Sequence, residues 1–183
     1  MIENCQIGEG TIVHPLTNLY GCQIGKNCKI ANFVEIGKGV IIGDNCKIEA
    51  FAFIPGLVQI GNNVFVGPHV CFTNDRRPKV DSPHFYPSIT KVRDGAIIGA
   101  GAIIRDGVII HEKAFIGMGS VVLEDVPATL LVVGNPAKLI ETCFNCDGAS
   151  TRPGGEGHPE YTSPRCNRCS VSGWGGSQYK RRG

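Results

Sequence analysis

The chain has 183 residues and a net charge of +2, with 7% aromatic residues, 19% charged residues and 25 glycines. A length of this order allows one domain with a buried core and excludes two full-size enzyme domains. The weak charge argues against nucleic-acid binding, because the basic residues cluster only at 180–182. The sequence shows no leader-like start and no apolar run of about 18 residues, so we expect a cytoplasmic protein without membrane contact.

An apolar residue, mostly aliphatic, recurs every six positions through most of the chain. The spacing is regular from Ile24 to Phe72 and from Val92 to Val122, and a one-residue slip extends it upstream to Ile7, giving eighteen hexads. Neither an α-helix nor an alternating strand keeps this period. The pattern therefore predicts a repeat protein in which short strands meet at tight corners and each coil is covered only by its neighbours.

Two further positions of the hexad are restricted. Glycine often follows the repeated aliphatic residue, which suits a chain that bends there without a Cβ penalty. A small or β-branched residue lies four positions after the aliphatic one and is expected to face inward. Cys28 and Cys46 occupy this position and are predicted to be buried small apolar groups.

The hexads are interrupted between Phe72 and Val92. The interruption, TNDRRPKVDSPHFYPSITK, holds about fourteen residues more than one hexad. A polar insertion that contains prolines does not fit inside a regular coil. Residues 73–91 are therefore predicted to form an ejected loop, a place where regular scaffolds often carry function.

The chain changes character after the last hexad. Pro136 suits the first turn of a short helix, with Asn135 as its cap. From Cys143 onward the composition shifts to Gly, Pro, Ser and Cys. We therefore predict a β-helix domain at 1–142 and a separate tail at 143–183.

The tail contains two Cys-x2-Cys pairs, Cys143 with Cys146 and Cys166 with Cys169, separated by nineteen residues. Each pair of thiolates can bind one side of a tetrahedral Zn²⁺, and metal binding supplies folding energy to a segment too polar to form a core. Four sulfur ligands favour a structural zinc over a catalytic one. A redox dithiol and unliganded thiols are the alternatives.

The repeat resembles the hexapeptide-repeat acyltransferases, and within them the nucleotide-sugar 3-N-acetyltransferases. Four segments carry the resemblance: LYGCQIGKNCKI at 19–30, VFVGPHVCFTNDRRPK at 64–79, DGAIIGAGAII at 94–104 and VPATLLVVGNPAKLI at 126–140. The resemblance implies a left-handed parallel β-helix of about six coils, an all-β fold that works as a homotrimer. It also implies acetyl transfer from acetyl-CoA to the 3-amino group of a UDP- or dTDP-linked sugar used for surface polysaccharide.

Asn74 is the predicted catalytic residue, because the asparagine of the FTN motif lies at the reaction centre of the similar enzymes. Many sugar acetyltransferases of this fold use a His-Pro base, but Arg77-Pro78 stands at that position here. An amide is no general base near neutral pH, so the amine is expected to arrive neutral. Its proton then leaves with the CoA sulfur or through water.

Further residues are candidates for ligand binding. Asp75 either accepts a hydrogen bond from the substrate or forms a turn, and Arg76 and Arg77 either hold a pyrophosphate or are solvated. His69 either lines the sugar pocket or is an exposed corner residue. By position in the family, acetyl-CoA is expected at Gly99, Ala100 and Gly117, with Lys138 near its phosphates, although these glycines also suit the coil.

The alternatives are an O-acetyltransferase and a non-catalytic β-helix scaffold. The absence of the His-Pro base favours an amine over a hydroxyl acceptor, since an alcohol is harder to activate without a base. A γ-type carbonic anhydrase would need three histidines around one metal, and the close pair five residues apart is absent from this sequence. Because one fold hosts several functions, acetyl-CoA binding is the property that separates an enzyme from a scaffold.

Overall fold

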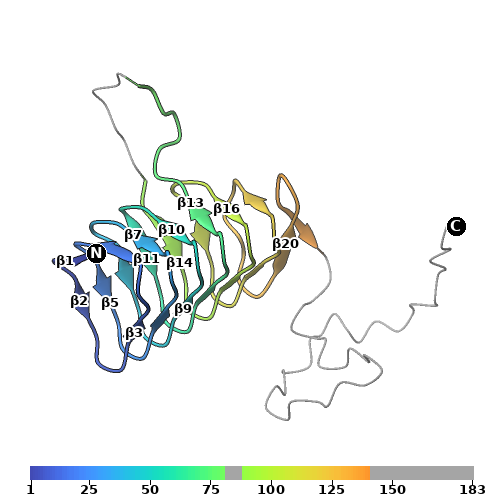
Figure 1. Cartoon of the computed structure of the whole chain (residues 1–183). Helices are drawn as coiled ribbons and strands as arrows, with labels where there is room; N and C mark the ends of the chain where they lie inside the picture. Colours follow the sequence, from blue (N-terminus) through green and yellow to red (C-terminus); the bar gives the residue numbers. More distant parts are fainter. Residues whose placement is uncertain (81–87, 141–183) are drawn as a thin grey trace, which may run out of the picture. The chain divides into compact units, whose positions relative to one another are not determined.

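The structure, a computed structural model, describes residues 1–80 and 88–140. They form an all-β prism of about seven stacked coils, which fits the predicted left-handed parallel β-helix (Figure 1). None of the described residues forms an apolar helix that would reach across a bilayer.

Three sheets form the sides of the prism. Sheet A contains β1 (Ile2–Glu3), β4 (Asn18–Tyr20), β7 (Glu35–Ile36), β10 (Phe53–Ile54), β13 (Cys71–Phe72), β16 (Ile103–Ile104) and β19 (Val121–Val122). Sheet B contains β2 (Gln6–Ile7), β5 (Gln23–Ile24), β8 (Ile41–Ile42), β11 (Val58–Ile60), β14 (Thr90–Val92) and β17 (Ile109–Ile110). Sheet C contains β3 (Ile12–Val13), β6 (Lys29–Ile30), β9 (Lys47–Ile48), β12 (Phe65–Val66), β15 (Ile97–Ile98), β18 (Phe115–Ile116), β20 (Leu131–Val133) and β21 (Lys138–Ile140).

The core consists of the two inward positions predicted from the hexad. The aliphatic residues from Leu19 to Val122 stack in register between coils, and nearly all of them are buried, as are the small residues such as Cys28 and Cys46. Parallel strands in register place identical hexad positions above one another, so each coil supplies the apolar surface that covers the next. The predicted fold class is confirmed.

The hexad glycines have a different role from the predicted one. Gly25, Gly43 and Gly61 do not bend the chain; a Cβ at Gly43 would lie 2.7 Å from the Gly61 carbonyl group of the next coil. The close approach of the next backbone therefore excludes a side chain. The bends occur two residues later, where Asn27, Asn45 and other residues have positive φ.

A ladder of side-chain oxygens fastens successive coils beside these glycines. The Oδ1 atom of Asn62 accepts a hydrogen bond from the backbone N–H of Asp44 at 2.8 Å, and Asp94 does the same for Asn62. Asn62 Oδ1 also lies 2.6 Å from the place where a Cβ of Gly43 would stand. A side chain at Gly43 would therefore displace the Asn62 side chain from its hydrogen bond with Asp44.

Gly43→Ala is expected to destabilise the domain by about 1–3 kcal/mol, because the new methyl group meets backbone as well as the Asn62 side chain. Urea unfolding measures the change. Gly39→Asn is the control, since Gly39 has φ 79° with nothing within 4 Å of a Cβ, and asparagine tolerates that backbone conformation. Equal stability of Gly43→Ala and the wild type would contradict the proposed role of the close approach.

The predicted short helix at Pro136 is wrong. Residues 134–137 form a turn, and β21 pairs antiparallel with β20, for example Val132 with Leu139. Because the chain reverses at this turn, the backbone N–H and C=O groups of β20 and β21 form hydrogen bonds between the two strands rather than within a helix. β1 and β20 also extend the helix beyond the predicted hexads, which gives about seven coils instead of six. The predicted boundary at 142 and the tail 143–183 lie outside the described residues.

Candidate active site

The ejected loop leaves the prism after β13 and rejoins it before β14 (Figure 1). A threonine stands at each end. The Thr73 hydroxyl donates to the Ile104 carbonyl at 3.3 Å and accepts from the Asp106 N–H at 3.1 Å, while Thr90 Oγ1 accepts from the Gly107 N–H at 3.0 Å. The next coil thus holds both ends of the loop.

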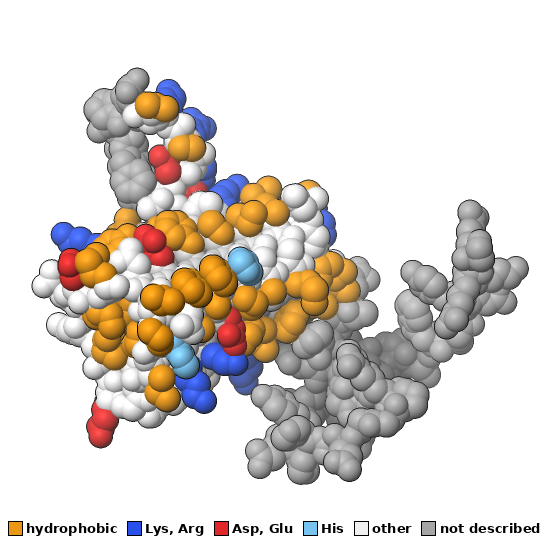
Figure 2. Space-filling view, viewed as in Figure 1, with side chains coloured by type: hydrophobic (Ala, Val, Ile, Leu, Met, Phe, Trp, Pro, Cys, Tyr) orange, Lys and Arg blue, Asp and Glu red, His pale blue; other side chains and the backbone are white. Residues whose placement is uncertain are grey.

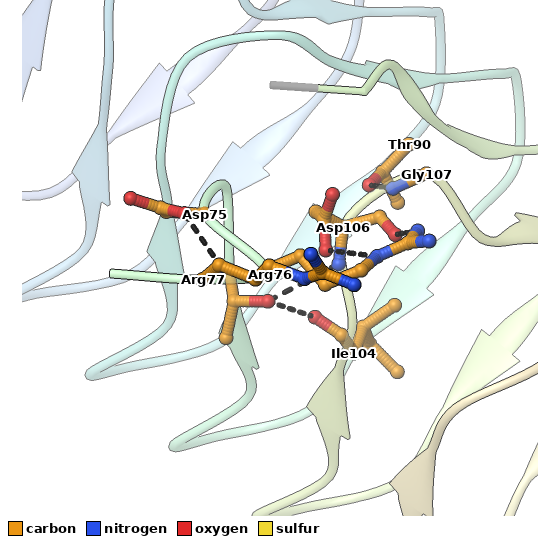
Figure 3. Close-up of polar contacts among 8 residues, drawn as sticks. Asp75, Arg76, Arg77, Thr90, Ile104, Asp106 and Gly107 are labelled. Atoms are coloured by element: carbon orange, nitrogen blue, oxygen red, sulfur yellow. Dashed lines mark hydrogen bonds and ion pairs between the residues drawn. The ribbon is translucent and has the colours of Figure 1, made fainter. Parts of the chain in front are cut away.

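Arg76 fastens the first part of the loop to the same coil. Its Nε lies 3.3 Å from Asp106 Oδ1, and its Nη2 donates to the Asp106 carbonyl oxygen at 2.9 Å (Figure 3). Asp106 is almost completely buried, whereas half of the Arg76 side chain is exposed. A buried carboxylate requires a charged or hydrogen-bonding partner, and Arg76 supplies it.

Asp75 forms a local hydrogen bond within the loop, whereas the Asn74 side chain does not. Asp75 Oδ1 accepts a hydrogen bond from the Arg77 backbone N–H at 2.8 Å, which forms a turn (Figure 3). The Asn74 side chain is half-buried and makes no hydrogen bond with the described part of the chain, and neither does the Arg77 guanidinium. Asn74 and Arg77 are therefore the predicted residues that remain free to meet a ligand.

Arg76→Ala is expected to destabilise the domain by about 1–3 kcal/mol, because it leaves the buried Asp106 carboxylate without its charged partner. Arg77→Ala is the matched control and should change the free energy of unfolding little. In a double-mutant cycle with Asp106→Ala, the two losses should fall short of additivity. If Arg76→Ala and Arg77→Ala were equally stable in urea, the clamp would contribute nothing.

A second group of predicted residues lies at the corner between sheets C and A. We name it the His69 corner. Its backbone turns through residues that all have positive φ: Leu16, Phe33, Phe51, His69, Gly101 and Gly119. The His69 ring stacks on Phe51 with centroids 4.8 Å apart, and Phe51 stacks on Phe33 at 4.9 Å. His69 is an exposed corner residue. The column of stacked rings ends at His69, because glycines occupy the same corner position in the next two coils.

The predicted acetyl-CoA residues converge at this corner. Gly99 and Gly117 lie in successive coils, where a Cβ on Gly99 would stand 2.6 Å from the Met118 nitrogen and one on Gly117 would stand 2.5 Å from Val133. Lys138 pairs with Val133 at the end of the same column. Close coil contact accounts for both glycines structurally, and the neighbouring Ala100 is exposed.

The two groups occupy different corners of the prism. Strand β13 separates His69 from Asn74, a path of five residues or on the order of 15 Å if extended. Cys71 lies between them on the outer face of sheet A, and burial raises the pKa of its thiol, which therefore stays protonated near neutral pH. Within one protomer, Asn74 and the predicted acetyl-CoA residues therefore lie at different corners, while His69, the other candidate for the sugar pocket, lies beside the acetyl-CoA residues.

Sequence reasoning missed Thr73, Thr90 and Asp106, which build the loop corner. A buried carboxylate at the third hexad position is unusual, since this position normally faces solvent. No group of three or more metal-binding side chains occurs in residues 1–80 and 88–140. The four cysteines predicted to bind zinc lie outside the described residues.

The model of the family "Bacterial transferase hexapeptide (six repeats)" matches residues 21–56, 39–74 and 89–124. The matched residues lie in coils of the β-helix, which are thus similar to the repeats of that family. The repeat chain is 47% identical over 51 residues to 2,3,4,5-tetrahydropyridine-2,6-dicarboxylate N-acetyltransferase from Clostridium perfringens, covering 28% of this chain and 22% of that protein. It is 30% identical over 140 residues to the bifunctional protein GlmU from Shouchella clausii, covering 76% and 29%. The chain thus spans less than a third of either relative.

Solved structures share the fold of the repeat chain at low sequence identity. A variant of AntD, an N-acyltransferase from Bacillus cereus in complex with dTDP-4-amino-4,6-dideoxyglucose and coenzyme A, gives a TM-score of 0.67 at 21% identity, over 75% of this chain and 82% of that chain. A variant of perosamine N-acetyltransferase from Caulobacter crescentus, in complex with CoA and GDP-perosamine, gives 0.57 at 23% identity, over 78% and 58%. These likenesses establish the β-helix architecture.

Proposed function

We propose that the chain is an acetyl-CoA-dependent N-acetyltransferase that acts on the 3-amino group of a UDP- or dTDP-linked sugar in the cytoplasm. The observation that carries the proposal is the loop corner, where an anchored loop presents a free Asn74 amide beside sheet A. Support also comes from a matched relative that is named as an N-acetyltransferase, and from fold neighbours whose structures hold CoA and nucleotide-linked amino sugars.

The chemistry needs few protein groups. The neutral amine attacks the thioester carbonyl carbon, the C–S bond breaks, and the products are an amide and CoA. The proton lost by the nitrogen ends on the CoA sulfur, directly or through water, so no side-chain base is required. Asn74 can donate a hydrogen bond to the carbonyl oxygen, where negative charge develops in the transition state.

We further propose that the working form is a homotrimer in which the loop corner of one protomer faces the His69 corner of its neighbour. The two corners lie apart within one protomer, and a neighbouring protomer would bring them together, since amine and thioester must lie in contact. Hydrophobic side chains gather on the exposed surface of the prism, as Figure 2 shows. The most exposed at the His69 corner and sheet A include Leu16, Phe33, Phe51, Ile103 and Met118.

Release of CoA thiol, measured against a panel of nucleotide-linked sugars, tests the proposed reaction. The panel contains UDP- and dTDP-linked 3-amino sugars, their 4-amino isomers, the type of sugar bound in the AntD variant structure, and the matching 3-hydroxy sugars. Fastest turnover with a 3-amino sugar supports the proposal. Preference for a 4-amino sugar corrects the position, preference for a hydroxyl sugar makes the protein an O-acetyltransferase, and failure to bind acetyl-CoA leaves a scaffold.

We also propose that the tail binds one structural Zn²⁺ through Cys143, Cys146, Cys166 and Cys169. Metal analysis of protein purified without chelator should then give one zinc per chain, and Cys146→Ser with Cys169→Ser should remove it. Acetyl transfer by the β-helix is expected to persist in that variant, because the four thiolates leave the metal no open position. A zinc-free wild-type chain would refute the site.

A further inference from the structure

Two cysteines at the N-terminal end of the prism face each other. Gln6 pairs with Gln23 in register, so the preceding residues, Cys5 and Cys22, stack in adjacent coils of sheet B. Their sulfur atoms are 3.3 Å apart, and both thiols are free. The spacing of adjacent strands, about 4.8 Å, lies within the range of Cα separations that disulfides span, roughly 4.4–6.8 Å.

The two thiols have unequal access to solvent. Cys22 is buried, while Cys5 is only partly covered, because β2 is the edge strand of sheet B among the described residues. Burial and the neighbouring Cys5 raise the pKa of the Cys22 thiol to about 12. A small reagent therefore reaches Cys5 first, and Cys22 stands behind it as a protected partner.

A second stacked pair shows that stacking alone is not the relevant feature. Cys28 and Cys46 also precede paired residues of adjacent coils, Lys29 and Lys47. Their thiols donate to carbonyl oxygens, Cys28 to Gly43 at 3.1 Å and Cys46 to Gly61 at 3.0 Å, as the Cys5 thiol does to Glu3 at 3.2 Å, but unlike Cys5 both residues are buried and closed to a small reagent. These thiols serve the coil as hydrogen-bond donors.

We propose that Cys5 and Cys22 form a reversible disulfide that fastens the first coil to the second. The oxidant is a small disulfide such as oxidised glutathione. The Cys5 thiolate attacks it, forming a mixed disulfide and releasing one glutathione thiol; Cys22 then loses its proton to water and attacks the Cys5 sulfur, releasing the second. One disulfide is reduced to two thiols for each protein disulfide formed. In a reducing compartment the thiols are the resting state, so the bond responds to oxidising conditions.

The first coil is the part of the prism that gains from such a bond. Ile2 and Ile7 are exposed there, whereas their counterparts in the next coil, Leu19 and Ile24, are buried. The backbone bonds from Gln6 to Cys22 and from Gly8 to Ile24 hold this coil to its neighbour. Segments with little buried apolar surface open locally with low free energy, and a covalent link between the two coils opposes that opening.

The experiment equilibrates the full reduced chain with mixtures of reduced and oxidised glutathione, blocks the remaining thiols and maps cross-linked peptides by mass spectrometry. We expect a peptide pair joined through Cys5 and Cys22, fully reversed by excess reduced glutathione, with none joined through Cys28 and Cys46. Hydrogen exchange at Gln6 and Gly8 should slow on oxidation. No Cys5–Cys22 link at any glutathione ratio would overturn the proposal, and so would equal linking of the Cys28–Cys46 pair.

Cys22→Val is the matched variant, since Val40 and Val58 occupy the same column in the next two coils. In this variant the mixed disulfide of Cys5 with glutathione should accumulate, and exchange at Gln6 should no longer respond to oxidation. If Cys5 stays unmodified in both proteins, it is not accessible and the proposal fails. This outcome does not depend on whether the protein catalyses acetyl transfer, because the residues proposed for that reaction take no part in the experiment.

Discussion

Asn74→Ala should lower kcat for acetyl transfer by roughly 30- to 1000-fold, equivalent to about 2–4 kcal/mol of transition-state stabilisation. The effect is large because the Asn74 amide, which makes no hydrogen bond with the described part of the chain, is the group that we propose faces the thioester carbonyl, and no side-chain base compensates for its loss. KM for acetyl-CoA should change much less, since the interaction strengthens as negative charge develops on the carbonyl oxygen. Steady-state kinetics with the best sugar of the panel measures both constants.

Asn18→Ala provides the matched control for this variant. Asn18 lies at the start of β4 on the same sheet, three coils before β13, and is half-buried like Asn74. Both variants should unfold at the same urea concentration as the wild type, and only Asn74→Ala should lose turnover. Unchanged kcat in a folded Asn74→Ala protein would remove Asn74 from the mechanism.

The fold could be predicted because a six-residue period allows few structures. Each inward position carries the same kind of residue in coil after coil, so the register between coils follows from the spacing. The C-terminal closure was wrong, and the structure also differs in the role of the hexad glycines and in having about seven coils rather than six. Asn135-Pro136 suits a helix start and a turn equally, and the choice depends on β21 pairing with β20, a contact that no local pattern reports.

The loop corner shows why the site was harder to predict than the fold. The triplet Arg-Asp-Gly occurs twice, at 93–95 and at 105–107. Asp94 is exposed and belongs to the ladder of side-chain oxygens, whereas Asp106 is buried beneath the loop and bound to Arg76. The sequence around each triplet is nearly the same, but Asp94 lies at the corner between sheets B and C, whereas Asp106 lies at the corner between sheets A and B, where Arg76 of the insertion contacts it. The sequence predicted Arg76 as a possible pyrophosphate ligand. In the structure its guanidinium group contacts Asp106 instead.

Mixing two inactive variants should restore activity if each active site is shared between neighbouring protomers. The first variant is Asn74→Ala, which disables the loop corner. The second is Gly101→Phe, which places an aromatic ring at the His69 corner beside the predicted acetyl-CoA residues. Gly101 has φ 68° and nothing within 4 Å of a Cβ, and Phe33 and Phe51 adopt the same conformation at the same corner. The prism should therefore tolerate the substitution while acetyl-CoA binding is lost.

After the two proteins are denatured together and refolded, a random mixture should recover about a quarter of the wild-type activity. In a cyclic trimer each site combines one protomer's loop corner with its neighbour's His69 corner, and a quarter of such pairings join two intact halves. The proteins refolded separately and then combined serve as the control and should stay inactive. Sites contained within single protomers would show no recovery, because every chain in the mixture carries one defect. Restoration would thus place the reaction between neighbouring β-helices, where the Asn74 amide of one protomer faces the His69 corner of the next.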